Sequence, residues 1–243
     1  MLNLRIIFFF LGILITTLGI SMLVPFLFEV YNSANNIKTF ISCSFFTLLI
    51  GISILIAFRT EEKKVNIKDT IVITTLSWPV LVLFSSLPFF YGTEVKDYSE
   101  AFFEATSGLT TTGASIYNNV ESLSIGILIW RSMLQWIGGI GIIVFAISII
   151  PILNTGGMKL FTQNWSEKPE ELHYRPKELV KSLGFIYIFF TILIFLLLSI
   201  SGLSIFDSLC HAMTTVATGG FSTHNNSVGY YNNFFTEIII VIG

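Results

Sequence analysis

Long apolar runs separated by short polar segments dominate this chain of 243 residues. An α-helix rises about 1.5 Å per residue, so roughly 20 apolar residues cross the ~30 Å hydrocarbon layer of a bilayer. By this criterion the sequence predicts five complete membrane spans and the beginning of a sixth. The spans cover about residues 6–28, 39–58, 70–91, 123–150 and 179–200, and the sixth starts near Phe234.

Two details of these spans affect the predicted structure. Pro25 is expected to kink or end the first span, and residues 29–36 form a polar turn after it. The chain stops about ten residues into the sixth span. A helix that ends in mid-bilayer leaves carbonyls unsatisfied, so we expect the sequence to be truncated there.

Between the third and fourth spans lies a segment that is too short to cross a bilayer. Residues 99–109 predict a short helix, and Thr110-Thr111-Thr112-Gly113-Ala114-Ser115 follows it directly. Irregular backbone at membrane depth is tolerated only where it is buried in protein or lines a water-filled path. We therefore predict a helix that enters the membrane partway and ends in a Thr/Gly loop.

A second copy of this unit occurs 107 residues later. Residues 207–222 align without gaps on residues 100–115, and Gly220 falls on Gly113. The flanking apolar runs recur at nearly the same offset. Duplicated re-entrant units are typical of a pore or transport path. The alternative is that these small residues serve ordinary close contacts between membrane helices.

Composition places the chain among polytopic membrane proteins, because 53% of its residues are hydrophobic and only 12% are charged. The first apolar run is longer than a typical signal core and no cleavage site follows, so we predict a retained span. Cys43 and Cys210 lie in or beside apolar runs, which favours buried thiols over a disulfide or metal site. The sequence contains no GxxxxGK[ST], GxSxG, HExxH or CxxC motif. We therefore predict no enzyme activity and no nucleotide or organic cofactor.

The basic residues indicate the orientation of the spans. With the amino terminus in the cytoplasm, two cations, Lys38 and Lys96, lie outside, and ten lie inside. This bias satisfies the positive-inside rule, and both short helices then open toward the outer face. The ten inner cations are Arg5, Arg59, Lys63, Lys64, Lys68, Lys159, Lys168, Arg175, Lys177 and Lys181.

The Thr/Gly loops have the chemistry of a cation filter. Rings of neutral backbone carbonyls can replace the hydration shell of a cation, and glycine permits backbone angles that a Cβ would forbid. The predicted ligands are carbonyls at matching positions of the two loops: Thr111, Thr112, Gly113, Thr218, Gly219 and Gly220, with the ion at Thr111, Thr112, Thr218 and Gly219.

Carboxylates precede each loop on the predicted outer side. They form a negative mouth that concentrates cations, or they are solvated connector residues and helix caps. For Asp207 and His211 we predict a helix cap and a hydrogen-bonded histidine, since two groups four residues apart do not define a metal site. The acidic residues before the first loop are Glu94, Asp97, Glu100 and Glu104.

Arg131 lies within the fourth span, where a cation normally faces protein or water and has a partner. We predict that it binds Glu104 or loop carbonyls and supports the first loop from behind. The alternative is that it snorkels to the outer interface. Gly138, Gly139 and Gly141 follow in the same span and indicate close helix packing.

Several of these segments, in this order, resemble the Trk/Ktr/HKT superfamily of potassium transporters, specifically its TrkH type. The two additional spans before the first span–short-helix–span repeat favour that type over the Ktr type. The resemblance covers most of the chain from about residue 70. It rests on Glu100-Ala101-Phe102-Phe103-Glu104, Thr111-Thr112-Gly113-Ala114, the run from Trp130 to Gly141, Asn154-Thr155-Gly156-Gly157-Met158 and Ala217-Thr218-Gly219-Gly220-Phe221-Ser222.

The resemblance implies an all-α polytopic protein of the bacterial inner membrane, with two amino-terminal spans followed by span–pore-helix–filter–span repeats. It also implies a homodimer and a cytosolic nucleotide-binding regulator, the TrkA protein. About one and a half of four repeats are present, without the gate of the third repeat. The expected divisions are a two-span region (1–69), a first repeat (70–153), a cytoplasmic loop (154–178) and a truncated second repeat (179–243).

The predicted function is potassium transport, with this chain as the amino-terminal half of a pore-forming uptake subunit. A non-conducting membrane scaffold or assembly subunit, or an inactive truncated fragment, is the alternative. Whether the ion moves alone or together with protons or sodium stays open at this point.

Overall fold

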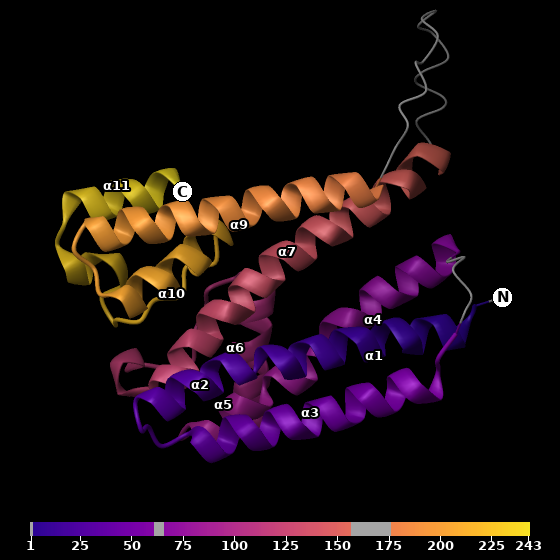
Figure 1. The fold of residues 1–243 in the computed structure, drawn as a ribbon, viewed down its shortest axis with the longest axis horizontal. Coiled ribbons are helices and arrows are strands. Elements are labelled where there is room, and N and C mark those ends of the chain that lie inside the picture. Colours follow the sequence, from indigo (N-terminus) through magenta and orange to yellow (C-terminus); the bar gives the residue numbers. More distant parts are fainter. Residues whose placement is uncertain (1, 61–65, 157–175) are drawn as a thin grey trace, which may run out of the picture.

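The computed structural model describes residues 2–60, 66–156 and 176–243. In these three ranges the chain forms helices joined by short loops, without strands (Figure 1). The helices are α1 (Leu4–Ser21), α2 (Leu23–Tyr31), α3 (Ile37–Ala57), α4 (Ile67–Ser85), α5 (Leu87–Gly92), α6 (Tyr98–Leu109), the 3-10 turn η1 (Val120–Ser122), α7 (Ile125–Gly156), α9 (Pro176–Ile200), α10 (Ile205–Val216), the 3-10 turn η2 (Ser227–Tyr231) and α11 (Phe234–Ile242).

Five helical segments of the described chain are long and apolar enough to cross a membrane, which confirms the five complete spans predicted. The expected loop 154–178 lies largely outside the described residues, because α7 is described to Gly156 and α9 from Pro176. The five segments are Leu4–Tyr31, Ile37–Ala57, Lys68–Gly92, Ile125–Ile143 and Glu178–Ile200.

Proline decides where the first span bends. The break lies at Met22, between α1 and α2, and Pro25 lies three residues further on, inside α2. Proline has no N–H to donate and its ring clashes with the carbonyl four residues earlier, here Ser21. The helix therefore breaks one turn before Pro25 and then continues to Tyr31. In the third span, α4 and α5 are likewise separated at Ser86, with Pro88 in the first turn of α5.

The helix α7 is the central element of the arrangement. In Figure 1 it runs obliquely between a group formed by α1, α3 and α4 and a second group formed by α9, α10 and α11. It packs against α2 and α6 on one side and against α9 and α10 on the other. The residues of α7 therefore contact both short helices and both of the loops that follow them.

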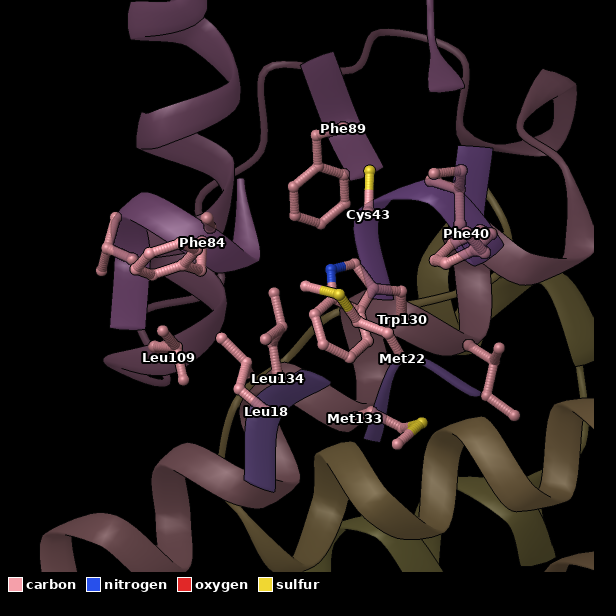
Figure 2. Close-up of a cluster of buried hydrophobic side chains, with 14 of the residues drawn as sticks. Leu18, Met22, Phe40, Cys43, Phe84, Phe89, Leu109, Trp130, Met133 and Leu134 are labelled. Carbon is pink, nitrogen blue, oxygen red and sulfur yellow. The ribbon is translucent and has the colours of Figure 1, made fainter. Parts of the chain in front are cut away.

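The apolar core gathers around Trp130 of α7 (Figure 2). Trp130 is fully buried, and its indole Nε1 donates a hydrogen bond to the carbonyl of Ser85 at 3.0 Å. Met22 and Phe40 bring the first two spans into contact with it, and Phe89 of α5 lies beside them. Because lipid is as apolar as these side chains, close packing and hydrogen bonds stabilise such a core.

Glu29 does not lie in a solvated turn, as its polar neighbours in the sequence suggested. It belongs to α2 and is completely buried. Its Oε1 accepts a hydrogen bond from the amide of Gly126 at 2.8 Å, and its Oε2 accepts one from the amide of Asn36 at 2.9 Å. Gly126 lies in the first turn of α7, where amides lack partners and negative charge is favourable. Glu29 therefore fixes the start of α7 to the first two spans.

Candidate functional site

The two short helices α6 and α10 have the same length and the same offset in the chain. α6 covers Tyr98–Leu109 and α10 covers Ile205–Val216, each 12 residues long. Both the first and the last residues differ by 107 positions, which is the offset of the sequence duplication. The duplicated sequence therefore forms duplicated helices, each followed by a Thr/Gly loop.

Both helices end in the same backbone motif. In each, the first amide beyond the cap bonds back three residues and the next amide bonds back five. This is the Schellman pattern, which satisfies the final carbonyls of a helix. The donor–acceptor pairs are Thr111–Gly108 at 3.0 Å, Thr112–Ser107 at 2.9 Å, Thr218–Thr215 at 2.8 Å and Gly219–Thr214 at 2.8 Å.

A threonine in each motif occupies the left-handed position that glycine normally takes. Thr111 has φ 54° and Thr218 has φ 52°, and two residues later Gly113 has φ 79° and Gly220 has φ 81°. The left-handed conformation costs a β-branched residue roughly 1–3 kcal/mol, so it persists only where the surroundings impose it. The same strained residue in both copies indicates that the loop conformation itself is needed.

Matching positions on the two short helices contact matching serines. Ser115 donates a hydrogen bond to Glu104 Oε1 at 3.0 Å, and His211 Nε2 lies 3.1 Å from the hydroxyl of Ser222. His211 Nδ1 lies 2.9 Å from the carbonyl oxygen of Asp207. A carbonyl only accepts, so Nδ1 carries the hydrogen and Nε2 accepts from Ser222. His211 is thus a hydrogen-bonded histidine, as expected.

Arg131 lies between the two loops and contacts both of them. Its Nε donates to Glu104 Oε1 at 2.8 Å in a buried ion pair, and its two terminal nitrogens donate to the carbonyl of Ser222 at 3.0 Å and the hydroxyl of Ser115 at 3.1 Å. The guanidinium also stacks 4.2 Å from the ring centre of Phe221. With 2% of its surface exposed, Arg131 does not snorkel to an interface.

Gln135, one helical turn after Arg131, forms hydrogen bonds to the second loop. Its Nε2 donates to the carbonyl of Gly219 at 2.7 Å, and its Oε1 accepts from the amide of Phe221 at 3.1 Å. Gly219 is buried, and a Cβ at Gly113 would collide with its carbonyl oxygen. No role was predicted for Gln135 from the sequence, although a polar side chain in an apolar span was a usable signal.

The predicted acidic mouth separates into exposed and buried carboxylates. Glu94, Asp97 and Glu100 are exposed in the connector and first turn of α6. Glu104 is fully buried and bound to Arg131, and its Oε2 also accepts from the amide of Ile116 at 2.9 Å. Only the first three can attract cations from solvent, whereas Glu104 belongs to the support behind the loop.

Asp207 is not the cap of its helix, contrary to our expectation. Ser204 caps α10 by accepting from the amide of Asp207 at 3.0 Å, and Thr223 donates to Asp207 Oδ1 at 2.6 Å. The Ser-x-x-Asp spacing is a recognisable capping signal. Burial raises the pKa of Asp207, but the hydrogen bonds from Thr223 and Ser204 and the nearby His224 outweigh it, so the net pKa is lowered.

His224, which the sequence did not suggest as a functional residue, links the segments that follow the two loops. Its Nδ1 lies 3.3 Å from Glu121 Oε1 and its Nε2 lies 3.7 Å from Asp207 Oδ1. Asn225 completes the link, because its side-chain oxygen accepts from the amide of Val120 at 2.7 Å. Within the described residues, no three His, Cys, Asp or Glu side chains are grouped to hold a metal ion.

Gly138 allows α7 to touch the end of α6. A Cβ at position 138 would collide with the backbone carbonyl of Leu109, the last residue of α6. At Gly141, one turn further along, the nearest atom to a new Cβ would be in the ring of Trp78, at 3.7 Å. The close approach predicted for this glycine-rich stretch thus occurs at Gly138, against α6, and at Gly139, where a Cβ would collide with the hydroxyl of Tyr187 in α9.

Replacing Gly138 with alanine is expected to displace the end of α6 and to destabilise the protein. Forcing an extra methyl group against fixed backbone typically costs about 1–3 kcal/mol. The melting temperature of the detergent-purified protein should therefore fall, while Gly141→Ala, in the same helix but in ordinary contact, should leave it unchanged or raise it. Equal melting temperatures for the two variants would contradict the assignment of Gly138.

Together, the fold and this site define a class: a polytopic α-helical membrane protein in which two short helices end in duplicated Thr/Gly loops, and one spanning helix holds both loops. Residues 36–243 match the family described as TrkH, cation transport protein. The chain belongs to that family, which consists of transport proteins and not of enzymes, as the absence of catalytic motifs predicted.

Two potassium uptake proteins illustrate the sequence similarity within this family. The chain is 36% identical over 240 residues to the Trk system potassium uptake protein TrkH of Halomonas elongata, covering 98% of this chain and 50% of that protein. It is 36% identical over 234 residues to the TrkH protein of Escherichia coli K12, covering 95% and 48%. This chain thus spans about half the length of the curated relatives it matches.

A solved structure shares the fold. The crystal structure of the potassium transporter TrkH from Vibrio parahaemolyticus superposes with a TM-score of 0.85 at 31% sequence identity. The match covers 99% of this chain and 49% of that one. The all-helical, membrane-spanning architecture expected from the sequence is therefore confirmed.

Proposed function

We propose that this chain supplies two filter segments of a potassium-conducting path, as the amino-terminal half of a TrkH-type uptake subunit. The observation that carries the proposal is the recurrence of one strained loop. Threonine and glycine adopt left-handed angles at 111 and 113 and again at 218 and 220. Such strain is concentrated at functional sites, where it persists because the surrounding structure maintains it.

Backbone oxygens are the groups that these loops offer to an ion. Rings of neutral carbonyls replace the hydration shell of K⁺, and relatives of this chain are named potassium uptake proteins. The ligands we propose are the carbonyls of Thr111, Thr112 and Gly113 in the first loop and of Thr218 and Gly220 in the second. Gly219 was also predicted, and its carbonyl is the one bound by Gln135.

Two further features support a path for cations. The exposed carboxylates of Glu94, Asp97 and Glu100 precede the first loop and would concentrate cations at its entrance. Arg131 is positive but buried, and Glu104 neutralises it. The loops are therefore held by a charge pair that presents little net field to the ion.

The assembly and orientation that we propose follow from the resemblance to this family and from the charge pattern. The amino terminus would lie in the cytoplasm of a bacterium, the subunit would form a homodimer in the inner membrane, and a TrkA-type protein would regulate it. The four predicted divisions of the chain, 1–69, 70–153, 154–178 and 179–243, are part of the same proposal. The proposed orientation rests on the excess of Lys and Arg in the segments assigned to the cytoplasmic side.

Growth of bacteria at limiting potassium tests the function. We expect the complete reading frame that contains residues 1–243 to restore growth to a strain without its own potassium uptake. The control is the Gly202→Ala variant, which should restore growth as the unsubstituted protein does. Gly202 is a positive-φ glycine outside both loops, with nothing within 4 Å of the new Cβ. Failure to restore growth, with the protein present in the membrane, would favour the non-conducting scaffold.

The DNA beyond the codon for Gly243 decides which polypeptide to test. If the frame continues with further Thr/Gly loops, the complete product is the transporter to be expressed. If a stop codon follows, potassium uptake by this chain would require a second polypeptide that supplies the remaining loops, and uptake by the chain alone would contradict the half-path that we propose.

A further inference from the structure

We propose that Gln135 is a positioning residue that sets ion selectivity by holding the peptide group of Gly219 away from the ion path. This inference rests on the proposed function of the two loops. It changes the ligand set expected from the sequence, because it makes the carbonyl of Gly219 part of the support and leaves Thr218 and Gly220 as the ion-facing residues of the second loop.

The side-chain amide of Gln135 forms hydrogen bonds through both its nitrogen and its oxygen. It has no exposed surface, and its donor and acceptor bind two backbone groups that stand on either side of Gly220. Nε2 must face Gly219, whose carbonyl only accepts, and Oε1 must face the amide of Phe221, which only donates. Both bonds would be lost in the flipped orientation, so the contact fixes one conformation of the peptide groups around Gly220.

The carbonyl of Gly219 also forms the contact between the two loops. A Cβ at Gly113 would collide with this oxygen, and a Cβ at Gly219 would collide with the amide of Gln135. The Gly219 peptide group therefore lies between the first loop and the Gln135 side chain. Moving the Gln135 amide would release the peptide group that sets the spacing between the loops.

Burial along the second loop agrees with this division of roles. Thr218 and Gly220 are exposed, whereas Gly219 between them is buried. At the matching position of the first loop, Thr112 is exposed, and its hydroxyl lies 2.8 Å from that of Thr110. The two loops thus share a backbone conformation but differ in burial at this position, where α7 supplies an amide to the second loop.

An amide is the group that the position requires. Glutamate has nearly the same shape but, when ionised, only accepts, so Gln135→Glu would lose the bond to Gly219 and bury a charge. Methionine has a similar volume and makes neither bond. Asparagine is one methylene shorter, so it would reach at most one of the two backbone groups.

The test is the K⁺/Na⁺ uptake ratio of the complete gene product carrying Gln135→Met. We expect the ratio to fall about tenfold, because both hydrogen bonds that orient the peptide groups around Gly220 are lost. Ser132→Ala is the control, because Ser132 is a neighbouring buried residue of α7 whose hydroxyl bonds to Leu128 of its own helix, at 3.2 Å, and to Cys210 within α10.

The outcomes separate this inference from the proposed function. An unselective unsubstituted protein would overturn both. A selective unsubstituted protein with an equally selective Gln135→Met variant would overturn only the role of Gln135. If neither Gln135→Met nor Gln135→Glu is recovered folded while Ser132→Ala is, Gln135 serves folding and the selectivity role is wrong.

Discussion

Alanine in place of Gly113 is expected to remove most of the preference for potassium over sodium. Gly113 has φ 79°, a left-handed conformation that costs an L-residue with a Cβ roughly 1–2 kcal/mol. The new Cβ would also collide with the carbonyl of Gly219 in the other loop. Overpacking of this kind typically adds about 1–3 kcal/mol. A loss of tenfold or more in the K⁺/Na⁺ uptake ratio of the complete gene product is the result we expect.

Gly220→Ala is the matched control for this experiment. Gly220 occupies the equivalent position of the second loop with φ 81°, but a Cβ there would meet nothing within 4 Å. It therefore carries the backbone strain without the collision, and we expect a smaller loss of selectivity. Equal effects of the two substitutions would show that the contact between Gly113 and Gly219 has no importance for the ion path.

Loss of the Arg131 side chain is expected to have the largest effect on stability. Arg131→Gln would leave Glu104 as a buried carboxylate without its cation, and breaking one partner of a buried pair costs about 3–5 kcal/mol. It would also remove the hydrogen bond to the Ser222 carbonyl in the second loop. The amount of folded protein in the membrane and its melting temperature in detergent should both fall.

A double-mutant cycle determines whether the pair itself is responsible. Glu104→Gln alone should also destabilise, and the double variant should lose less than the sum of the two single changes. Arg131→Lys keeps the charge but cannot reproduce the fork of contacts to Glu104, Ser115 and Ser222, so we expect partial loss. Lys96→Gln, which removes an exposed cation, should change stability by less than about 0.5 kcal/mol. Additive effects of the two single variants would contradict the pairing.

Much of the fold could be predicted from local patterns in the sequence. The five spans follow from run length and hydropathy alone, since every backbone group in lipid must be satisfied within a helix. The two short helices could be placed because a gapless duplication makes each copy a check on the other. Their observed ends, Leu109 and Val216, keep the offset of 107 residues. The partner of Arg131 was also predictable, because an unpaired buried cation is too costly to persist.

The supports of the loops could be predicted only in part. The Ser-x-x-Asp signal for the cap at Ser204 was present in the sequence, and Gln135 stood out as a polar residue in an apolar span. Neither signal says which partner the side chain meets. Gln135 binds residues more than 80 positions away, and Glu29 binds Gly126 from nearly 100 positions away. These partners depend on how α2, α7 and the loops are oriented relative to one another.

The sequence by itself determined the class of protein, the number of spans in the described chain and the duplication, because hydropathy and repetition are properties of the chain in order. Only the tertiary structure decided that Glu29 is buried, that Gly138 meets the end of α6, and that the carbonyl of Gly219 is bound by Gln135. These contacts depend on the rotation and crossing of packed helices. Many side chains set that geometry together, so no local stretch of sequence specifies it.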